Sequence, residues 1–325
     1  MKLYIGIDGG ASTTRGVLIN ENGKTLNKII INKGTNLKEF ENQAPKLLIA
    51  LIIDLCTELE LSIKDISAFG FGLAAVSFDR GRESLFKELD RNGISNRSLL
   101  INDAEAAYKI VCPDNVGILV TVGTGIICIA KNLDGTFVKS AGKGHENDLG
   151  SGYWIGKETF LKLALNEAII DFDKDLLEIK NIILDKFNYD SFKETLEYIT
   201  ESEDSLTLKA SIAKDILLAS NKNKVAMKIV QQATYNLSEY ILQIIDSLDY
   251  KPSSELILFG NGSIINSAIY RKSLSDALLF DYQNISWVFS NLSASYGAAI
   301  LAALSKDNIT ITLKKILNGD YLVSA

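Results

Sequence analysis

Residues 5–19 read IGIDGGASTTRGVLI, and the rest of the chain is organised around this stretch. An apolar run that carries Asp8 stops at two glycines, passes through small and hydroxyl residues, and resumes as a second apolar run. The pattern predicts a strand, a tight turn and a returning strand. It fits either an ordinary hairpin or a turn that binds phosphate.

The residue types of this turn suit a phosphate. Glycine has no Cβ, so backbone N–H groups can approach an anion closely, and hydroxyl side chains add further donors. Asp8 lies at the strand end, where its carboxylate could hold a hydrated metal ion. The candidate phosphate-binding residues of the turn are Gly9, Gly10, Ser12, Thr13 and Thr14.

The composition is that of a folded protein with two cores. Of its 325 residues, 47% are hydrophobic and 23% are charged. Charges interrupt the apolar runs well short of the roughly 18 to 20 residues that a membrane span needs, so we expect no membrane segment. Because Met1 leads directly into a strand, we expect no signal peptide and a cytoplasmic location. The net charge of −6 argues against nucleic-acid binding but leaves local binding of a phosphate open.

The three cysteines are Cys56, Cys112 and Cys128. They are widely separated, form no CxxC pair and lie in apolar surroundings. We therefore predict buried, reduced thiols, and neither disulfides nor a cluster site.

Strands and helices alternate after the opening hairpin. A turn at Gly23 and the apolar segment 28–32 predict a third antiparallel strand. The segments that follow are predicted as a helix at 37–59, a strand at 66–72, a helix at 82–92 and a strand at 98–101. Asn102 or Asp103 could cap the next helix. Three meander strands followed by alternating helices and strands predict a mixed α/β sheet.

The same plan then repeats. Residues 116–122 are predicted as a strand, Gly123-Thr124-Gly125 as a turn and residues 126–131 as the returning strand, much like the opening hairpin. Residues 153–247 carry long helical patterns with polar faces, which predicts a helical layer. The remaining predictions are strands at 137–139, 255–259 and 285–289 and a small-residue helix at 293–304.

Two similar α/β units, each opening with a glycine-turn hairpin, indicate a duplicated fold with a ligand cleft between its halves. We place the units at residues 1–108 and 109–325, and the last helix can return to the first unit.

Together the motifs resemble those of the superfamily of actin, heat-shock chaperone ATPases and sugar kinases. Residues 8–15 are similar to the first phosphate motif, residues 102–104 to the connecting motif and residues 122–125 to the second phosphate motif. The adenosine region is matched by Gly260-Asn261-Gly262 together with residues 295–299. Within the superfamily, GKG at 142–144 and DLGSGYWIG at 148–156 resemble the branch of N-acetylglucosamine kinases and BadF/BadG/BcrA/BcrD ATPases. Five ordered motifs over nearly the whole chain are a specific signal.

The resemblance implies two α/β lobes of the ribonuclease H-like, actin-like (ASKHA) fold that close over ATP and an amino sugar. It implies that Asp8 holds Mg²⁺ through water and that Asp103 is the base that takes the proton of the attacking hydroxyl. The implied reaction is transfer of the γ-phosphate to the 6-hydroxyl of N-acetylglucosamine or a relative such as N-acetylmuramic acid or glucosamine. Alternatively, Asp103 only caps its helix and Asp8 only braces the turn.

The resemblance also implies the binding residues. Those for the nucleotide are Gly9, Gly10, Ser12, Thr13, Thr14, Gly123, Thr124, Gly125, Gly260 and Gly262. Those for the sugar are Asn36, Asp103, Gly142, Lys143, Gly144 and Asp148. Asn36 can instead belong to a loop at a helix start, and the single histidine, His145, is favoured as a loop residue over a base. We expect Tyr153 and Trp154 in the core.

The chain departs from these relatives in the sugar loop. Lys143 stands where amino-sugar kinases usually have Trp, and Leu149 where Glu is common. A lysine here favours an acidic substituent such as the lactyl carboxylate of N-acetylmuramic acid. Related kinases are often homodimers, and we expect one here.

Two other functions stay open at this point. One is the ATPase that activates 2-hydroxyacyl-CoA dehydratases, which shares the fold but uses a cysteine-ligated iron–sulfur cluster, and the cysteine settings speak against it. The other is a non-catalytic, nucleotide-dependent sugar sensor or scaffold, against which Asp103 argues.

Overall fold

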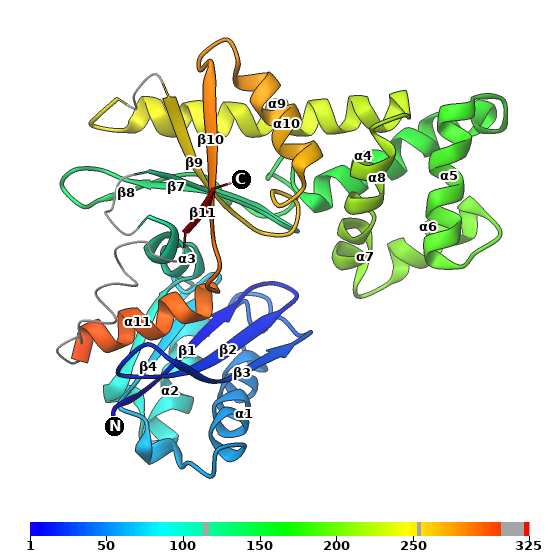
Figure 1. The fold of residues 1–325 in the computed structure, drawn as a ribbon. Helices are drawn as coiled ribbons and strands as arrows, with labels where there is room; N and C mark the ends of the chain where they lie inside the picture. Colours follow the sequence, from blue (N-terminus) through cyan, green and yellow to red (C-terminus); the bar gives the residue numbers. More distant parts are fainter. Residues whose placement is uncertain (113–116, 252–254, 307–321, 325) are drawn as a thin grey trace. The chain divides into compact units, whose positions relative to one another are not determined.

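The computed structural model describes residues 1–112, 117–251, 255–306 and 322–324. The chain forms two compact units, residues 1–116 with 288–324 (unit 1) and residues 117–287 (unit 2). Each unit is built on one mixed β-sheet, drawn as arrows in Figure 1.

The sheet of unit 1 has the strand order β3-β2-β1-β4-β5. Its strands are β1 (Leu3–Gly9), β2 (Thr14–Asn20), β3 (Thr25–Ile31), β4 (Ala68–Leu73) and β5 (Ser98–Asn102). Strand β1 runs antiparallel to β2 and parallel to β4. The predicted antiparallel meander and mixed sheet are confirmed.

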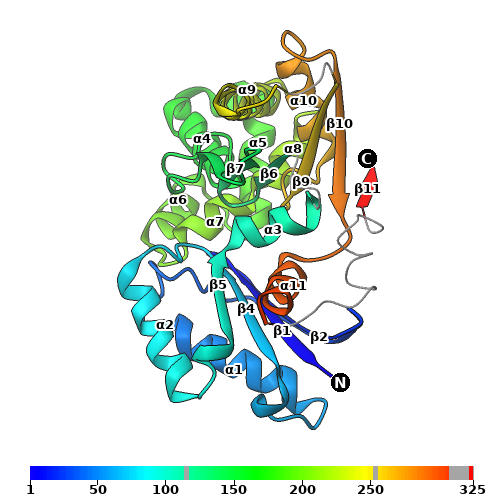
Figure 2. The same cartoon turned by 90° about the vertical axis from the view of Figure 1, so that its left-hand side faces the viewer.

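Helices cover both faces of this sheet. They are α1 (Ala44–Thr57), α2 (Asp79–Arg91), α3 (Asp103–Val111) and α11 (Ala294–Lys306). Side chains alternate along a strand, so Ile5 and Ile7 pack with α1 and α2, whereas Tyr4 packs with α11. Figure 2 shows α1 and α2 on one side of the strands and α11 on the other.

Two glycines allow α11 to lie directly on the strands. A Cβ at Gly6 would lie 1.9 Å from the Ser295 carbonyl oxygen, and one at Gly70 would lie 2.0 Å from that of Ala298. The small residues of α11 that face these glycines are buried. This close contact fixes the distance between α11 and β1. It therefore also helps to fix the position of the turn that follows β1.

The prediction of one helix over 37–59 is wrong at its start. Residues 37–43 form turns, and α1 begins only at Ala44, with Pro45 in its first turn. Proline is tolerated there because the first N–H groups of a helix have no intrahelical partner. Leu37 is buried, and its N–H instead donates to Ala74 O (3.2 Å) in the loop after β4.

The second sheet has the order β11-β10-β9-β6-β7-β8. Most of it belongs to unit 2, whereas residues 288–290 and 322–324 are assigned to unit 1. Its strands are β6 (Ile118–Val122), β7 (Ile126–Lys131), β8 (Phe137–Ala141), β9 (Glu255–Asn261), β10 (Asn284–Ser290) and β11 (Leu322–Ser324). Strand β6 is antiparallel to β7 and parallel to β9, the same relation that β1 has to β2 and β4. The predicted repeat of the hairpin is therefore confirmed over its described residues, and position 116 lies outside them.

The predicted helical layer is also confirmed. It consists, among the described residues, of α4 (Gly152–Leu165), α5 (Lys174–Phe187), α6 (Phe192–Glu201), α7 (Ser205–Ser211), α8 (Ala213–Ala219) and α9 (Lys224–Ser247), and α10 (Ala268–Leu278) follows β9. Short 3₁₀ turns occupy Ile63–Asp65, Ser95–Arg97 and Glu167–Phe172. The long helix α9 contacts β6, β7 and β8 and supports the sheet from one face.

The cysteine prediction is confirmed, because all three thiols are free and buried. Tyr153 and Trp154 are buried as expected. Within the described ranges, no helix combines the length and apolar character needed to cross a membrane.

Candidate active site

The first hairpin turn holds its shape through backbone contacts. Gly10 N donates to Thr13 O (3.2 Å), and Thr35 N donates to Gly10 O (2.9 Å). A Cβ at Gly9 would lie 2.0 Å from Thr35 Oγ1, whereas one at Gly10 would meet only Thr13 O at 3.9 Å. Gly9 is thus required by packing, while Gly10 keeps one side of the turn open, as a phosphate cradle requires.

The hydroxyl groups of this turn divide into two kinds. Thr14 is buried, and its Oγ1 donates to Lys33 O (2.8 Å) and lies 3.0 Å from Thr35 Oγ1. The hydroxyls of Ser12 and Thr13 make no hydrogen bond within the part of the chain that the structure describes. Thr14 therefore braces the loop, and Ser12 and Thr13 keep their donors for a ligand.

Asp8 lies in a charged environment at the end of β1. Its side chain is 17% exposed, and Arg15 Nη1 lies 3.4 Å from its Oδ2. Burial, together with the negative charge of Asp103, raises the pKa of Asp8 from 3.8 to about 6, although Arg15 acts in the opposite direction. The structure thus brings Asp8 and Asp103 close enough for their charges to interact.

This pair of carboxylates suits Mg²⁺. Among the described residues, no group of three or more His, Cys, Asp or Glu side chains could hold a metal ion. Mg²⁺ is usually bound by one or two carboxylates, with waters and substrate phosphates completing its shell. Two like charges in a partly buried setting are the arrangement that a divalent cation relieves.

Asp103 is the first residue of α3. The helix is capped by Asn102, whose Oδ1 accepts from Ala104 N (3.0 Å), and Asp103 Oδ1 accepts from the same N–H (2.9 Å). A Cβ at Gly72 would lie 3.7 Å from Asp103 Cα, so Asp103 begins its helix against the end of β4. The capping function is carried by Asn102, and a second role for the Asp103 carboxylate is compatible with this geometry.

Asn36 lies in the loop that packs beside the first turn. Its Oδ1 accepts from Lys38 N (2.9 Å) and Glu39 N (3.4 Å), so it caps a turn as the loop interpretation expects. Its Nδ2 donates to no group in the described ranges, which leaves two donors for a sugar hydroxyl.

Sequence reasoning gave Arg15 no role. Asp8 and Arg15 are directly paired across β1 and β2, because they are equally distant from the turn. Asp8 lies two residues before Gly10 and Arg15 two residues after Thr13, so the hairpin register alone predicts that they face each other. The guanidinium forms an ion pair with Asp8 and lowers the pKa of its carboxyl group.

The second glycine turn is joined to the start of α4. Gly123 N donates to Gly125 O (3.0 Å), while Gly123 O accepts from Gly152 N (2.8 Å) and Thr124 O accepts from Tyr153 N (3.1 Å). A Cβ at Gly123 would meet no atom within 4 Å. The turn is therefore fixed on its carbonyl side and open at Gly123.

Asp148 organises the predicted sugar loop. It is 4% exposed, and its Oδ1 accepts from Lys143 N (2.9 Å). Burial raises its pKa, while backbone hydrogen bonds from Lys143, Ile126, Gly142 and Gly144 oppose this rise. A Cβ at Gly125 would lie 3.6 Å from Asp148 Oδ2. The structure thus brings the second turn, Asp148 and residues 142–144 together within unit 2.

The two parts of the predicted adenosine region lie in different units. Gly260 lies near the end of β9 and Gly262 directly follows this strand, and a Cβ at Gly262 would lie 2.5 Å from Val122 O, next to the second glycine turn. Residues 295–299 belong to α11 of unit 1. Ser295 and Ala298 lie against the glycines of β1 and β4, and a Cβ at Gly297 would lie 2.4 Å from Ala106 O of α3.

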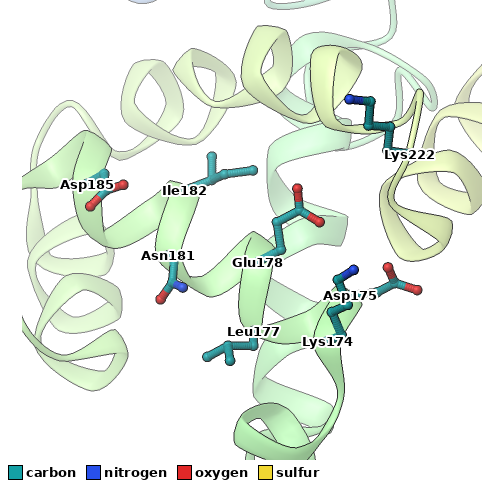
Figure 3. A pocket seen from close by; sticks show the side chains of 8 residues that line it. All are labelled: Lys174, Asp175, Leu177, Glu178, Asn181, Ile182, Asp185 and Lys222. Carbon is teal, nitrogen blue, oxygen red and sulfur yellow. The ribbon is translucent and has the colours of Figure 1, made fainter.

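A separate hollow opens on the helical layer of unit 2. It has a volume of about 550 Å³ and lies along α5, where Asp175, Glu178 and Asp185 face it together with Lys222 (Figure 3). None of the predicted site residues lines it. Mixed charges and the absence of any motif residue set this hollow apart from the candidate active site.

Both sheets open with a hairpin whose first strand is parallel to a later strand, and each hairpin carries a glycine turn. This repeated plan defines a duplicated, ribonuclease H-like protein of the two-lobed actin-like (ASKHA) class. Residues 5–305 match the model of the BadF/BadG/BcrA/BcrD ATPase family, and the chain belongs to this family.

Named relatives cover nearly the whole chain. It is 28% identical over 313 residues to the N-acetylmuramic acid/N-acetylglucosamine kinase of Clostridium acetobutylicum. The aligned region covers 93% of this chain and 98% of that kinase. It is 22% identical over 320 residues to the N-acetyl-D-glucosamine kinase of Dictyostelium discoideum, with 94% and 99% covered. The solved structure of a Chromobacterium violaceum protein, provisionally described as an N-acetylglucosamine kinase, has a TM-score of 0.70 at 21% identity, with 93% and 99% covered.

Proposed function

We propose that this protein is an ATP-dependent amino-sugar kinase. In this proposal it transfers the γ-phosphate of ATP to the 6-hydroxyl of N-acetylglucosamine or a close relative such as N-acetylmuramic acid or glucosamine. The observation that carries the proposal is the Asp8 and Asp103 pair, a partly buried set of carboxylates beside an open glycine turn. The names of the relatives, which match over more than nine-tenths of the chain, support an amino sugar as acceptor.

Each group has a distinct task in this mechanism. The Asp103 carboxylate takes the proton of the attacking hydroxyl, which makes the oxygen a better nucleophile. Asn36 and Asp148 orient the sugar through hydrogen bonds, and the backbone of residues 142–144 contributes further donors and acceptors. The first turn, which is open beside Gly10, binds the phosphates through the Ser12 and Thr13 hydroxyls. The second turn, which is open beside Gly123, binds them from its exposed backbone side. Asp8 would hold Mg²⁺, which would neutralise part of the phosphate charge.

The dehydratase-activator alternative is disfavoured by the cysteines. Burial raises the pKa of the thiols of Cys56, Cys112 and Cys128, and all three are buried. A cluster ligand must be a thiolate, which this setting disfavours.

The acceptor can be tested by measuring ADP formation with glucosamine, N-acetylglucosamine, N-acetylmuramic acid, N-acetylmannosamine and glucose. We expect N-acetylglucosamine or N-acetylmuramic acid to stimulate turnover most, with kcat in the range of about 1 to 10³ s⁻¹ that is typical of enzymes. ADP formation that no sugar increases would favour the ATPase or the non-catalytic alternatives instead.

Lys143 is proposed to favour an acidic acceptor. Its side chain is exposed in the loop that Asp148 organises, so its ammonium group can pair with a lactyl carboxylate. Lys143→Ala should raise the KM for N-acetylmuramic acid about threefold to tenfold, the worth of one hydrogen bond, and should leave the KM for N-acetylglucosamine unchanged. Lys143→Arg keeps the charge and serves as the control. Equal kinetics of wild type and Lys143→Ala on N-acetylmuramic acid would refute this role.

A further inference from the structure

The segment that carries Asp148, residues 142–150, is here called the acceptor loop. Tyrosine hydroxyls from three different helices hold it. Tyr240 of α9 accepts from Leu149 N (3.2 Å) and donates to Asn147 O (3.1 Å). Tyr270 of α10 donates to Gly150 O (2.8 Å), and Tyr153 of α4 donates to Glu146.

The hydroxyl of Tyr240 has a special place among these contacts. It binds the residue before Asp148 and the residue after it, so one side chain fixes both neighbours of the carboxylate. Asp148 Oδ1 in turn accepts from Lys143 N at the other end of the loop (2.9 Å). Two sets of hydrogen bonds therefore hold residues 143–149: one from Lys143 N to the Asp148 side chain, and one between the Tyr240 hydroxyl and the backbone of residues 147 and 149.

Helix α9 forms the wall along which this loop runs. Ala233 and Tyr240 lie about two turns apart, which places them on the same helix face. Gly150 has a φ of +97°, and a Cβ there would lie 2.3 Å from Ala233 O. The loop thus touches α9 closely at Gly150 and is tied to the same face at Tyr240.

We propose that Tyr240 is a positioning residue for the amino-sugar acceptor, acting through the acceptor loop on Asp148. This inference rests on the proposed function. A polar group that binds a sugar must be held by its surroundings, because a group that is first ordered by the ligand gives up part of the binding free energy. In this proposal Tyr240 does not act on the nucleotide, so its loss should change the binding of the sugar and not the binding of ATP.

Loss of the hydroxyl should leave the fold intact. Tyr240 is half-buried, and the N–H of Leu149 and the carbonyl of Asn147 lie in exposed residues, so water can replace the lost partner. Loss of these hydrogen bonds should lower the free energy of unfolding only slightly. Without the hydroxyl, however, the acceptor loop is no longer held in a single orientation. Tyr240→Phe therefore separates positioning from folding.

The experiment compares Tyr240→Phe with Tyr235→Phe. Tyr235 is on the same helix, is 54% exposed, and its hydroxyl makes no hydrogen bond within the described ranges. We expect Tyr240→Phe to raise the KM for N-acetylglucosamine about threefold to tenfold, the equivalent of one hydrogen bond, with kcat and the KM for ATP unchanged. Tyr235→Phe should match wild type in all three constants.

A readout without turnover accompanies the kinetics. Amide hydrogen exchange of residues 143–150 should be faster in Tyr240→Phe than in Tyr235→Phe, and N-acetylglucosamine should protect these amides less in Tyr240→Phe.

The outcomes separate this inference from the proposed function. Wild-type protein that shows no sugar-stimulated turnover overturns the proposed function and this inference with it. Sugar-stimulated wild type with an unchanged Tyr240→Phe, or with equal changes in the KM for sugar and for ATP, overturns the positioning role of Tyr240 alone.

Discussion

Asp103→Asn is expected to lower kcat about 10²- to 10⁴-fold, the usual contribution of a general base, while the binding of ATP and N-acetylglucosamine largely survives. Asparagine has the same shape and keeps an Oδ1 that accepts from Ala104 N, so the start of α3 should be preserved. It cannot take a proton from the attacking hydroxyl. Steady-state kinetics together with titration calorimetry of both ligands would measure the two effects separately.

A matched control for this variant lies at the start of α2. Asp79 is also the first residue of its helix, its side chain is 78% exposed, and within the described residues it pairs only with Arg82 (2.8 Å). Asp79→Asn should leave kcat at the wild-type level, because exposed pairs contribute little. A near-normal kcat in Asp103→Asn would remove Asp103 from the chemistry and leave it a structural residue.

Asp8→Asn is expected to abolish phosphoryl transfer and at the same time to stabilise the ligand-free protein. Folding raises the pKa of Asp8 from 3.8 to about 6, mainly by burial and by the charge of Asp103. The folded protein therefore holds this proton more tightly than the unfolded chain does. Hence the free energy of unfolding falls as the pH rises from about 4 to about 6, and the full cost is present above that pH.

The size of this effect follows from the same shift. A difference of about two pKa units corresponds to an upper bound of about 3 kcal/mol, and partial exposure of the side chain reduces it to about 1 to 2 kcal/mol. Asp8→Asn should be more stable than wild type by this amount at pH 8, with the difference vanishing near pH 4. Urea unfolding at several pH values without Mg²⁺ or nucleotide would measure it.

Arg15→Gln provides the opposite change. Arg15 lowers the pKa of Asp8, so its removal should weaken the fold at pH 8 while Asp8→Asn strengthens it. Equal stability of wild type and Asp8→Asn at pH 8 would contradict the view that the Asp8 carboxylate is held at a cost to folding. Full activity of Asp8→Asn with Mg²⁺ would contradict its proposed role as metal ligand.

The hairpins could be predicted from the sequence because their signals are local. Apolar runs interrupted at Gly9 and at Gly123 specify strand, turn and strand without any distant contact. The pairing of Asp8 with Arg15 was equally local and followed from the register alone. The helix start at Ala44 was missed because apolar residues before it, such as Leu37, continue the helical period although they pack against a distant loop.

The support of the acceptor loop could not be predicted. Tyr240 and Tyr270 lie 91 and 120 residues from the backbone groups that they bind. The helical pattern of α9 indicates which residues share a face, but it does not specify what that face meets. Such contacts depend on how a strand, a loop and a helix are arranged in three dimensions, which periodicity does not encode.

The proposed reaction is the transfer of phosphate from ATP to a sugar hydroxyl. Phosphorus–proton correlation NMR of the products from ATP, Mg²⁺ and N-acetylglucosamine tests it most directly. The proposed function predicts a sugar phosphate whose phosphorus couples to the protons on the carbon that bears the 6-hydroxyl. Release of inorganic phosphate alone, at a rate that N-acetylglucosamine does not change, would contradict it.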